Sequence, residues 1–408
     1  MPDSNTTLSP SGPGKHSGKL TMPLVVLLAI CLFGRAAEAR YGGGTGEPDD
    51  PYLIYTAEQM NEIGADANDW DKQFKLMADI DLSAYTETDF NIIGTSFGNA
   101  FSGVFDGSGR KIYNFTYTST GANNIGLFGY VRGENAVIKD LGLIDTNVDA
   151  GAGKYTGSLV GRLKTGTVTG CYAQGGSVSG ERCVGGLVGQ NEDFIFWPGM
   201  TSTSIISNCY STVIVSGRIF VGGLVGVNQE GTITNCYSTG SVSENWGVGG
   251  LVGYNSQGTI TKCYSTGGVT GTTDVGGLVG KKFSGWVVTS FWDTQTSGQL
   301  TSAGGTGKTT VQMQTIGTFT SAGWDFWNLW TICEGMNYPV FFWQIPVVDF
   351  LCPDGVNFID FAFFANHWRQ NNCNEANHYC EGTDLDFSGT VDEADLQIFF
   401  DNWLAGVE

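Results

Sequence analysis

Short runs of apolar and polar residues follow one another along most of the chain, and glycine-rich segments separate them. The stretch 259–264, Thr-Ile-Thr-Lys-Cys-Tyr, is representative, because β-branched and aromatic residues are interleaved with polar ones. Such runs are typical of β-strands, in which successive side chains point to opposite faces. The repeated region, 185–290, has no stretch long enough for a helix with a 3.6-residue apolar period. The pattern therefore predicts a mainly β fold.

The strands recur in a unit of constant length. The block Gly-Gly-Leu-Val-Gly occurs at 185–189, 222–226, 249–253 and 276–280. The block Cys-Tyr-Ser-Thr begins at Cys209, Cys236 and Cys263. Successive copies lie 27 residues apart, except that an insertion near 194–203 lengthens one period to 37. A fixed period of this length indicates a solenoid. Room for three short strands per unit favours a right-handed parallel β-helix, with leucine and valine facing inward.

This unit resembles the GLUG motif, which is named for a block of this kind. The resemblance covers residues 157–280, and looser copies of the block stand at 125–129 and 157–161. Proteins with this motif are extracellular, often adhesin-like, surface proteins of bacteria. The resemblance therefore implies a location and a shape, and it does not imply a reaction.

The beginning of the chain, 1–39, has the pattern of an export signal. Lys15 and Lys19 precede the apolar run 24–33, and small residues then lead to Ala37-Glu38-Ala39, an A-x-A cleavage site. The apolar run is too short to span a bilayer. No later segment is apolar enough to do so either, so the sequence predicts a secreted or cell-surface protein with no integral membrane segment after removal of the signal.

Changes of pattern divide the rest of the chain. The expected parts are an N-terminal cap with the first coils at 40–120, the GLUG-repeat β-helix at 121–293, a C-terminal cap at 294–345 and a second domain at 346–408. A short helix over 56–63, beginning at Thr56, would cover the open end of the solenoid. The aromatic residues of 324–330 and 338–343 are interpreted as the core of the C-terminal cap. The alternative interpretation is a platform for sugar rings.

Net charge restricts the possible binding partners, and the positions of the cysteines indicate which of them form disulfides. The net charge of −20 disfavours nucleic acid and anionic membranes as partners. Four cysteines share one phase of the repeat and are expected to stack inside the solenoid as free, buried thiols: Cys171, Cys209, Cys236 and Cys263. One disulfide or more is expected among the cysteines of the C-terminal part, with the pairing left open: Cys333, Cys352, Cys373 and Cys380.

The C-terminal segment 346–408 is strongly acidic, with Arg369 as its one lysine or arginine. In its loop 384–395, oxygen-bearing side chains stand at positions 1, 3, 5, 9 and 12, and Gly389 stands at position 6. A hard divalent cation needs about six to eight oxygen ligands, and this spacing is typical of a Ca²⁺ loop. The expected ligands are Asp384, Asp386, Ser388, Asp392 and Asp395, with the backbone carbonyl of Thr390.

This loop and the helix after it resemble a type I dockerin module, a small α-helical, EF-hand-like domain in which Asp closes the loop. The resemblance implies Ca²⁺-dependent docking to a cohesin-like protein or another surface receptor. An earlier copy has Leu351 and Pro353 at loop positions 3 and 5. It would form a second, weaker site from Asp349, Asp354, Asn357 and Asp360. Positions 10 and 11 carry partner recognition in dockerins. Here they are Phe358-Ile359 and Glu393-Ala394 in place of the small hydroxyl pair common in that family.

Parallel β-helices also host polysaccharide lyases and hydrolases, so the carboxylates of the repeats need a separate test. Hydrolysis of a glycosidic bond requires two carboxylates that flank it. The best pair is Glu192 and Asp193, next to the insertion. The histidines all lie outside the repeats, at His16, His367 and His378. We assign no catalytic residue from the sequence, and the question of enzymatic activity stays open.

Three hypotheses result. The first is a non-enzymatic extracellular binding or scaffold protein, associated with polysaccharide or cell-surface glycan and docked through a Ca²⁺-binding module. The alternative is a dockerin-bearing polysaccharide-degrading enzyme, either a lyase or a glycoside hydrolase, with its active site on the β-helix. The third is a structural surface element that binds no ligand.

Overall fold

The computed structural model describes residues 41–193, 204–352 and 355–405. The expected export signal at 1–39, the insertion at 194–203 and Asp354 lie outside the described residues. Within the described ranges, no helix has both the length and the apolar character needed to cross a bilayer.

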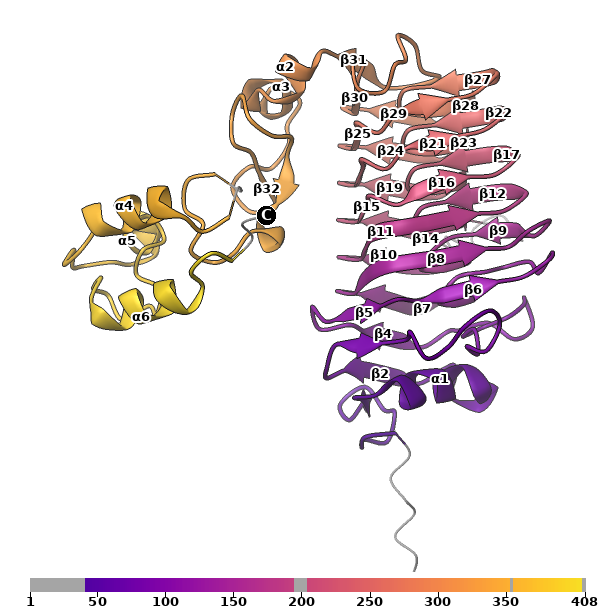
Figure 1. The fold of residues 1–408 in the computed structure, drawn as a ribbon, viewed down its shortest axis with the longest axis horizontal. Helices are drawn as coiled ribbons and strands as arrows, with labels where there is room; N and C mark the ends of the chain where they lie inside the picture. Colours follow the sequence, from indigo (N-terminus) through magenta and orange to yellow (C-terminus); the bar gives the residue numbers. More distant parts are fainter. Residues whose placement is uncertain (1–40, 194–203, 353–354, 406–408) are drawn as a thin grey trace, which may run out of the picture. The chain divides into compact units, whose positions relative to one another are not determined.

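Most of the described chain is a parallel β-solenoid, which confirms the predicted mainly β repeat fold (Figure 1). One 13-stranded sheet runs the length of the coils. Its main path is β1 (Tyr52–Ile54), β2 (Gln73–Leu76), β4 (Val104–Asp106), β7 (Phe128–Lys139), β10 (Val160–Thr169), β13 (Val188–Glu192), β18 (Val225–Gln229), β23 (Val252–Ser256) and β28 (Val279–Phe283). Beside this path lie β14 (Ser204–Ser207), β19 (Thr232–Thr234), β24 (Thr259–Thr261) and β29 (Trp286–Val288).

Two further parallel sheets complete the coils. The second 13-stranded sheet contains β3 (Ile80–Asp81), β5 (Lys111–Tyr113), β6 (Thr116–Thr118), β8 (Gly142–Asp149), β11 (Tyr172–Ser179), β15 (Tyr210–Ser211), β16 (Ile214–Ser216), β20 (Tyr237–Ser238), β21 (Val242–Ser243), β25 (Tyr264–Ser265), β26 (Val269–Thr270), β30 (Phe291–Asp293) and β31 (Thr306–Lys308). The five-stranded sheet contains β9 (Lys154–Thr156), β12 (Arg182–Gly185), β17 (Ile219–Gly222), β22 (Trp246–Gly249) and β27 (Thr273–Gly276).

The register of the sheets follows the sequence repeat. Val225 pairs with Val252, and Val252 pairs with Val279, so each Gly-Gly-Leu-Val-Gly block stacks on the block of the next coil. The leucines of these blocks are fully buried, as expected. Gly223 shows why glycine stands here, because a Cβ atom would overlap the carbonyl oxygen of Gly250 in the next coil.

The predicted cysteine column is present inside the solenoid. Cys171, Cys209, Cys236 and Cys263 are all buried and free. Each thiol donates to backbone carbonyl groups; that of Cys236, for example, lies 3.1 Å from the carbonyl oxygen of Thr234. The pairing that the sequence left open is Cys333 with Cys352 and Cys373 with Cys380.

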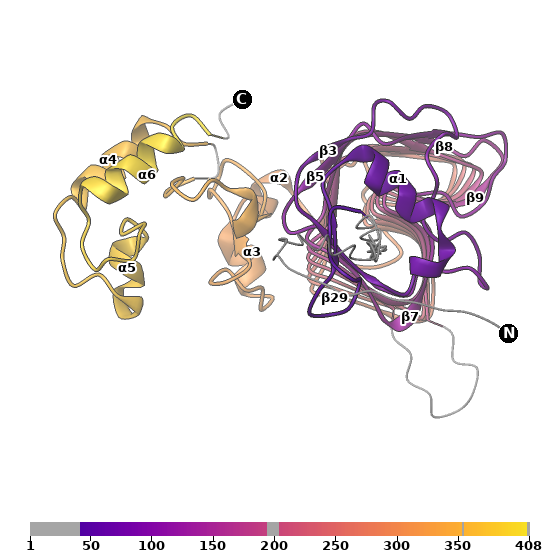
Figure 2. The ribbon, with the colours of Figure 1, turned by 90° about the horizontal axis from the view of Figure 1, so that it is seen from below.

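The expected N-terminal helix is α1 (Ala57–Ala65), followed by η1 (Ala67–Asp69). The Thr56 hydroxyl accepts a hydrogen bond from the backbone N–H of Gln59 at 3.3 Å and caps α1. Met60 and Ile63 on this helix are buried in the core of the first coils. Figure 2 shows α1 lying across the N-terminal end of the coils, where it covers their core from solvent.

Residues 294–345 make two kinds of contact with the solenoid. The amide of Gly277 donates to Thr301 O at 3.0 Å, and the amide of Ala303 donates to Val279 O at 2.9 Å, which extends the last coil. The aromatic residues beyond this point pack against the flank of the solenoid instead of its end. This part contains α2 (Thr310–Met313), α3 (Ile316–Thr320), β32 (Trp330–Thr331), β33 (Val340–Phe341) and η2 (Phe342–Gln344).

The C-terminal region is small and helical. Its elements are α4 (Phe358–Asn366), η3 (Glu375–Asn377), α5 (His378–Glu381) and α6 (Glu393–Asp401). A separate core of Val348, Val356, Phe364, Val391 and Phe399 holds them together. Two of these valines, Val356 and Val391, occupy matching places before α4 and α6, in line with the repeat found in the sequence.

Candidate functional site

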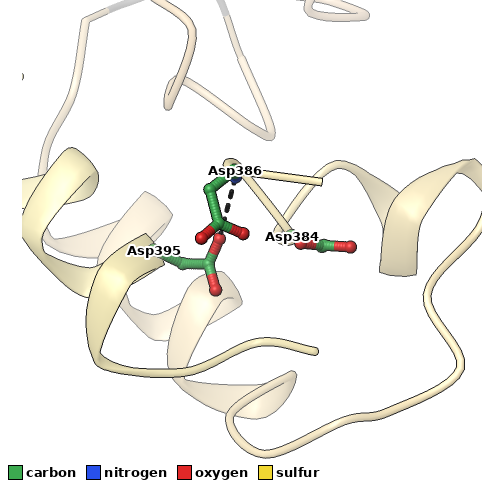
Figure 3. Close-up of side chains that lie close together, drawn as sticks. All are labelled: Asp384, Asp386 and Asp395. Atoms are coloured by element: carbon green, nitrogen blue, oxygen red, sulfur yellow. Dashed lines mark hydrogen bonds between the residues drawn. The ribbon is translucent and has the colours of Figure 1, made fainter. Parts of the chain in front are cut away.

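The acidic loop before α6 brings three carboxylates together (Figure 3). Asp384, Asp386 and Asp395 each offer an oxygen atom, and these atoms all lie within 4.8 Å of one another. Asp384 and Asp395 are buried, whereas Asp386 is exposed. They occupy positions 1, 3 and 12 of the expected Ca²⁺ loop.

Backbone amides hold Asp395 in place at the start of α6. Its Oδ1 atom accepts from the amides of Leu385 at 2.6 Å and Asp386 at 3.1 Å, and its Oδ2 atom accepts from the amide of Asp392 at 2.8 Å. Asp392 is the N-cap of α6, because its Oδ1 atom accepts from the amide of Ala394 at 2.9 Å. The N-terminus of α6 therefore fixes the position of the Asp395 carboxylate.

The turn at Gly389 fixes the positions of the other two carboxylates, Asp384 and Asp386. Gly389 has φ +94°, a conformation that side chains disfavour, and its amide donates to Asp384 Oδ2 at 3.0 Å. The Ser388 amide donates to Asp384 Oδ1 and to Asp386 Oδ1, each at 3.0 Å. The Ser388 hydroxyl donates to the carbonyl oxygen of Thr390 at 3.2 Å. All six residues expected as ligands thus belong to one closed loop, with the carboxylates at its centre.

The electrostatics of the loop oppose the charged form of the buried Asp384. Burial raises the pKa of Asp384, and the neighbouring charges of Asp395 and Asp386 add to this rise against the hydrogen bonds that Asp384 accepts. Hydrogen bonds from Ser388 lower the pKa of the exposed Asp386. Among the described residues, no lysine or arginine forms an ion pair with these three carboxylates. A hard cation bound to the cluster would relieve the repulsion, so this donor set fits Ca²⁺.

The earlier loop, 349–360, has a similar set of backbone hydrogen bonds but fewer carboxylates that could bind a cation. Asp360 takes the place of Asp395, because its carboxylate accepts from the amides of Phe350 at 2.8 Å and Asn357 at 3.0 Å. Asp349 accepts from the amide of Gly355 at 3.0 Å. Asn357 caps α4 by accepting from the amide of Ile359 at 2.7 Å. The described residues of this loop do not form a three-carboxylate cluster like that of the second loop.

The carboxylates of the repeats are arranged differently from a catalytic pair. Glu192 is buried and accepts hydrogen bonds from Arg162 and from Lys164, whose Nζ atom lies 2.8 Å from Glu192 Oε1. Burial alone would raise the pKa of Glu192, but these two cations outweigh it and hold the pKa below the ordinary 4.5. A general acid needs the opposite shift. Glu192 is therefore the anionic member of a buried ion cluster, with Asp193 buried next to it.

No role was predicted for the tyrosine that follows each stacked cysteine, and the structure assigns it one. Tyr172, Tyr210, Tyr237 and Tyr264 form a ladder of stacked rings on the flank of the solenoid, with centroids 4.8 to 4.9 Å apart and planes within 5° of parallel. The segment 313–343 packs on this ladder mainly through Phe319, Trp324, Trp330 and Phe341. Tyrosines in one phase of the repeat were the signal, because parallel coils place equivalent residues one above another.

Comparison with known proteins agrees with this architecture. The family model described as the GLUG motif matches residues 180–216, 221–243 and 244–270. These segments lie in β12 to β26, so the GLUG repeats of this chain form the coils of the β-solenoid.

Two curated relatives match the repeat region in part. Halomucin of Haloquadratum walsbyi is 33% identical over 151 residues, which is 36% of this chain and 2% of halomucin. A protein of Evansella cellulosilytica named "Putative Gly-rich membrane protein" is 34% identical over 132 residues, which is 31% of this chain and 15% of that protein. The matched region thus spans only a small part of either relative.

One solved structure is similar over most of the chain. It is a crystal structure from Bacteroides ovatus described as "a putative immunoglobulin A1 protease", with a TM-score of 0.57 and 23% sequence identity. The similarity covers 74% of this chain and 95% of that one. At this level of identity the likeness concerns the fold alone.

Proposed function

We propose that this chain is a non-enzymatic extracellular binding or scaffold protein. Its solenoid presents a long, regular surface to polysaccharide or cell-surface glycan. Its C-terminal module is a dockerin-like domain that docks to a cohesin-like or other surface receptor when Ca²⁺ is bound. Two disulfides in the C-terminal part, and relatives named "Halomucin" and "Putative Gly-rich membrane protein", support an extracellular or surface location.

The observation that carries this proposal is the carboxylate cluster of the loop 384–395. Two of its three members, Asp384 and Asp395, are buried, all three accept hydrogen bonds from backbone amides, and one oxygen atom of each lies within 4.8 Å of the others. Folding such a cluster without a cation brings like charges together, whereas a bound Ca²⁺ makes the same geometry favourable. Asp384, Asp386 and Asp395 would hold the ion, with further oxygens from Ser388, Thr390 and Asp392.

The ion cluster at Glu192 argues against hydrolysis by the carboxylate pair Glu192 and Asp193. The sequence offered Glu192 and Asp193 as its best candidates for polysaccharide hydrolysis. Hydrolysis would need one carboxyl group with a raised pKa facing an open cleft. Glu192 instead has a lowered pKa, and its two cationic partners occupy both of its oxygen atoms.

Calcium titration of the chain without its export signal tests the proposal. Calorimetry should show binding of Ca²⁺, and a Ca²⁺ concentration about 100-fold above Kd should stabilise the C-terminal module by about 2.7 kcal/mol over a chelator-treated sample. Asp386→Asn removes an exposed ligand and should weaken the binding. Asp401→Asn changes an exposed carboxylate of α6 outside the cluster and should leave it unchanged. Identical melting of the module with Ca²⁺ and with chelator would contradict the proposal.

A further inference from the structure

One column of stacked positions on the flank of the solenoid begins with a lysine and a glycine and then becomes aromatic. Strand register places Lys111, Gly142 and Tyr172 one above another on β5, β8 and β11. From Tyr172 onward the column is aromatic: Tyr210, Tyr237, Tyr264 and Phe291. The tyrosine ladder therefore begins at Tyr172, next to a rung that has no side chain.

The aromatic segment, residues 313–343, covers most of the tyrosine ladder and leaves its Tyr172 end partly uncovered. Trp330 and Phe341 lie over Tyr237, whose ring is almost fully buried. The last aromatic residue of the segment, Trp343, lies with its ring centroid 5.6 Å from that of Tyr172 and is 45% exposed. Tyr172 is itself only partly buried. Both rings thus keep surface open to solvent at the place where the cover ends.

A groove of about 810 Å³ lies at this place. Trp343, Gln344, Tyr172 and Tyr210 line one part of it, and the earlier coils line the rest. The missing side chain at Gly142 leaves room for the Tyr172 ring, because a Cβ atom there would overlap this ring. Gly109 and Gly170 also line it and add no side chain that could fill it.

Hydrogen-bonding groups of both kinds surround the aromatic surface. Lys111 offers a donor, Asp140 an acceptor and Gln174 an amide that can do both. Gln344 offers an Nε2 donor, because its Oε1 atom already accepts from Tyr237 and Phe341. Gln344 is held in place by the Tyr237 hydroxyl, which lies 2.9 Å from its Oε1 atom. Neither sign of charge dominates the rim, because it carries one lysine and one aspartate.

We propose that this groove binds a short neutral oligosaccharide, with a sugar ring stacked on Trp343 and Tyr172. A sugar ring has an apolar C–H face that suits an aromatic ring, and its hydroxyl groups need donors and acceptors at close range. The volume falls within the range of about 300–1,000 Å³ that is usual for ligand sites. The net charge of −20 disfavours an acidic glycan. The inference rests on the proposed function, because it places glycan recognition at a particular site of the solenoid.

Calorimetry and tryptophan fluorescence with the chain lacking its export signal test this inference. The probes are cellotriose, xylotriose and mannotriose, with trigalacturonate as an acidic comparison. At least one neutral trisaccharide should bind more tightly than trigalacturonate. Trp343→Ala should weaken that binding at least about tenfold. Trp286→Ala, which removes a 71% exposed tryptophan from β29 outside the groove, should not change it.

A second variant guards against misfolding of the first. Asp140 has φ +52°, and asparagine adopts this conformation as readily as aspartate, so Asp140→Asn should melt like the parent chain. It should still weaken trisaccharide binding several-fold, because the stronger acceptor is lost.

The outcomes separate this inference from the proposed function. Equal trisaccharide binding by the parent chain and Trp343→Ala would overturn the groove as the site. Retention on polysaccharide without binding of any trisaccharide would overturn the inference and leave the proposed function standing. Tighter binding of trigalacturonate than of every neutral probe would overturn the choice of a neutral ligand. Absence of both trisaccharide binding and polysaccharide retention would overturn the inference and the glycan-binding part of the proposed function together.

Discussion

Replacing Glu192 by glutamine separates a structural carboxylate from a catalytic one. Glu192 accepts hydrogen bonds from Arg162 and Lys164, and the exposed fractions of the side chains are 6% for Glu192, 9% for Lys164 and 24% for Arg162. The glutamine keeps the volume and removes the negative charge. Lys164 then keeps its charge at a buried position, whereas Arg162 can turn partly toward water.

The magnitude follows from that burial. Removing one partner of a buried ion pair costs about 3–5 kcal/mol. The partial exposure of Arg162 places this cluster near the lower end of that range, at about 3 kcal/mol. Where amide exchange follows the opening equilibrium, this corresponds to roughly 100-fold faster exchange in the coils around β10 and β13. Glu181→Gln is the matched control, because Glu181 pairs with an Arg218 side chain that is 62% exposed. It should cost less than about 1 kcal/mol.

The stability that Glu192 contributes should depend on pH in one direction. The pKa of Glu192 is lowered in the folded chain from its ordinary 4.5, so its contribution to stability is present above about pH 4.5 and is lost as the pH falls through the folded value. The difference between parent and Glu192→Gln should therefore be full at pH 7 and shrink below pH 4.5. Hydrogen exchange and thermal unfolding at pH 7 and below pH 4.5 measure this difference. Unchanged or increased stability of Glu192→Gln at pH 7 would refute the reasoning, and an increase is what removal of a strained catalytic carboxylate produces.

Two further predictions concern the core of the coils. Gly267→Ala should destabilise the solenoid by about 1–3 kcal/mol, because its new methyl group would overlap the carbonyl oxygen of Gly240. The neighbouring Gly268→Ala should stay within about 0.5 kcal/mol, since the nearest atom is 3.9 Å away, and equal melting of the two variants would contradict the stacking. The four thiols of the column, Cys171, Cys209, Cys236 and Cys263, should react with a thiol reagent only after unfolding, and their rapid reaction in the native chain would show that the column is not closed.

The repeat made the solenoid predictable because parallel stacking turns a sequence period into a spatial column. Cys209, Cys236 and Cys263 lie 27 residues apart, so one coil per period puts them on one line inside the core. Local signals were equally direct at Thr56, where a hydroxyl caps α1, and at Gly389, where the loop bends.

The partners of Glu192 were harder to foresee because they lie in a coil that departs from the repeat. Arg162 and Lys164 precede Glu192 by 30 and 28 residues, not 27, and their coil carries only a loose copy of the block. The aromatic segment posed a different problem. Its residues indicated a buried cluster, but only tertiary packing selects the tyrosine-lined flank over the end of the solenoid. The free surface of Trp343 depends on where that segment stops.

The most direct test of the account is to place the chain, residues 40–408, with Ca²⁺ on a panel of plant and algal polysaccharides. Retention of the protein on each solid and the appearance of new reducing ends or unsaturated products are measured in the same samples. The account predicts retention on at least one neutral polysaccharide with no new ends. New ends that disappear in the Glu192→Gln variant would contradict it and make the chain a polysaccharide-degrading enzyme.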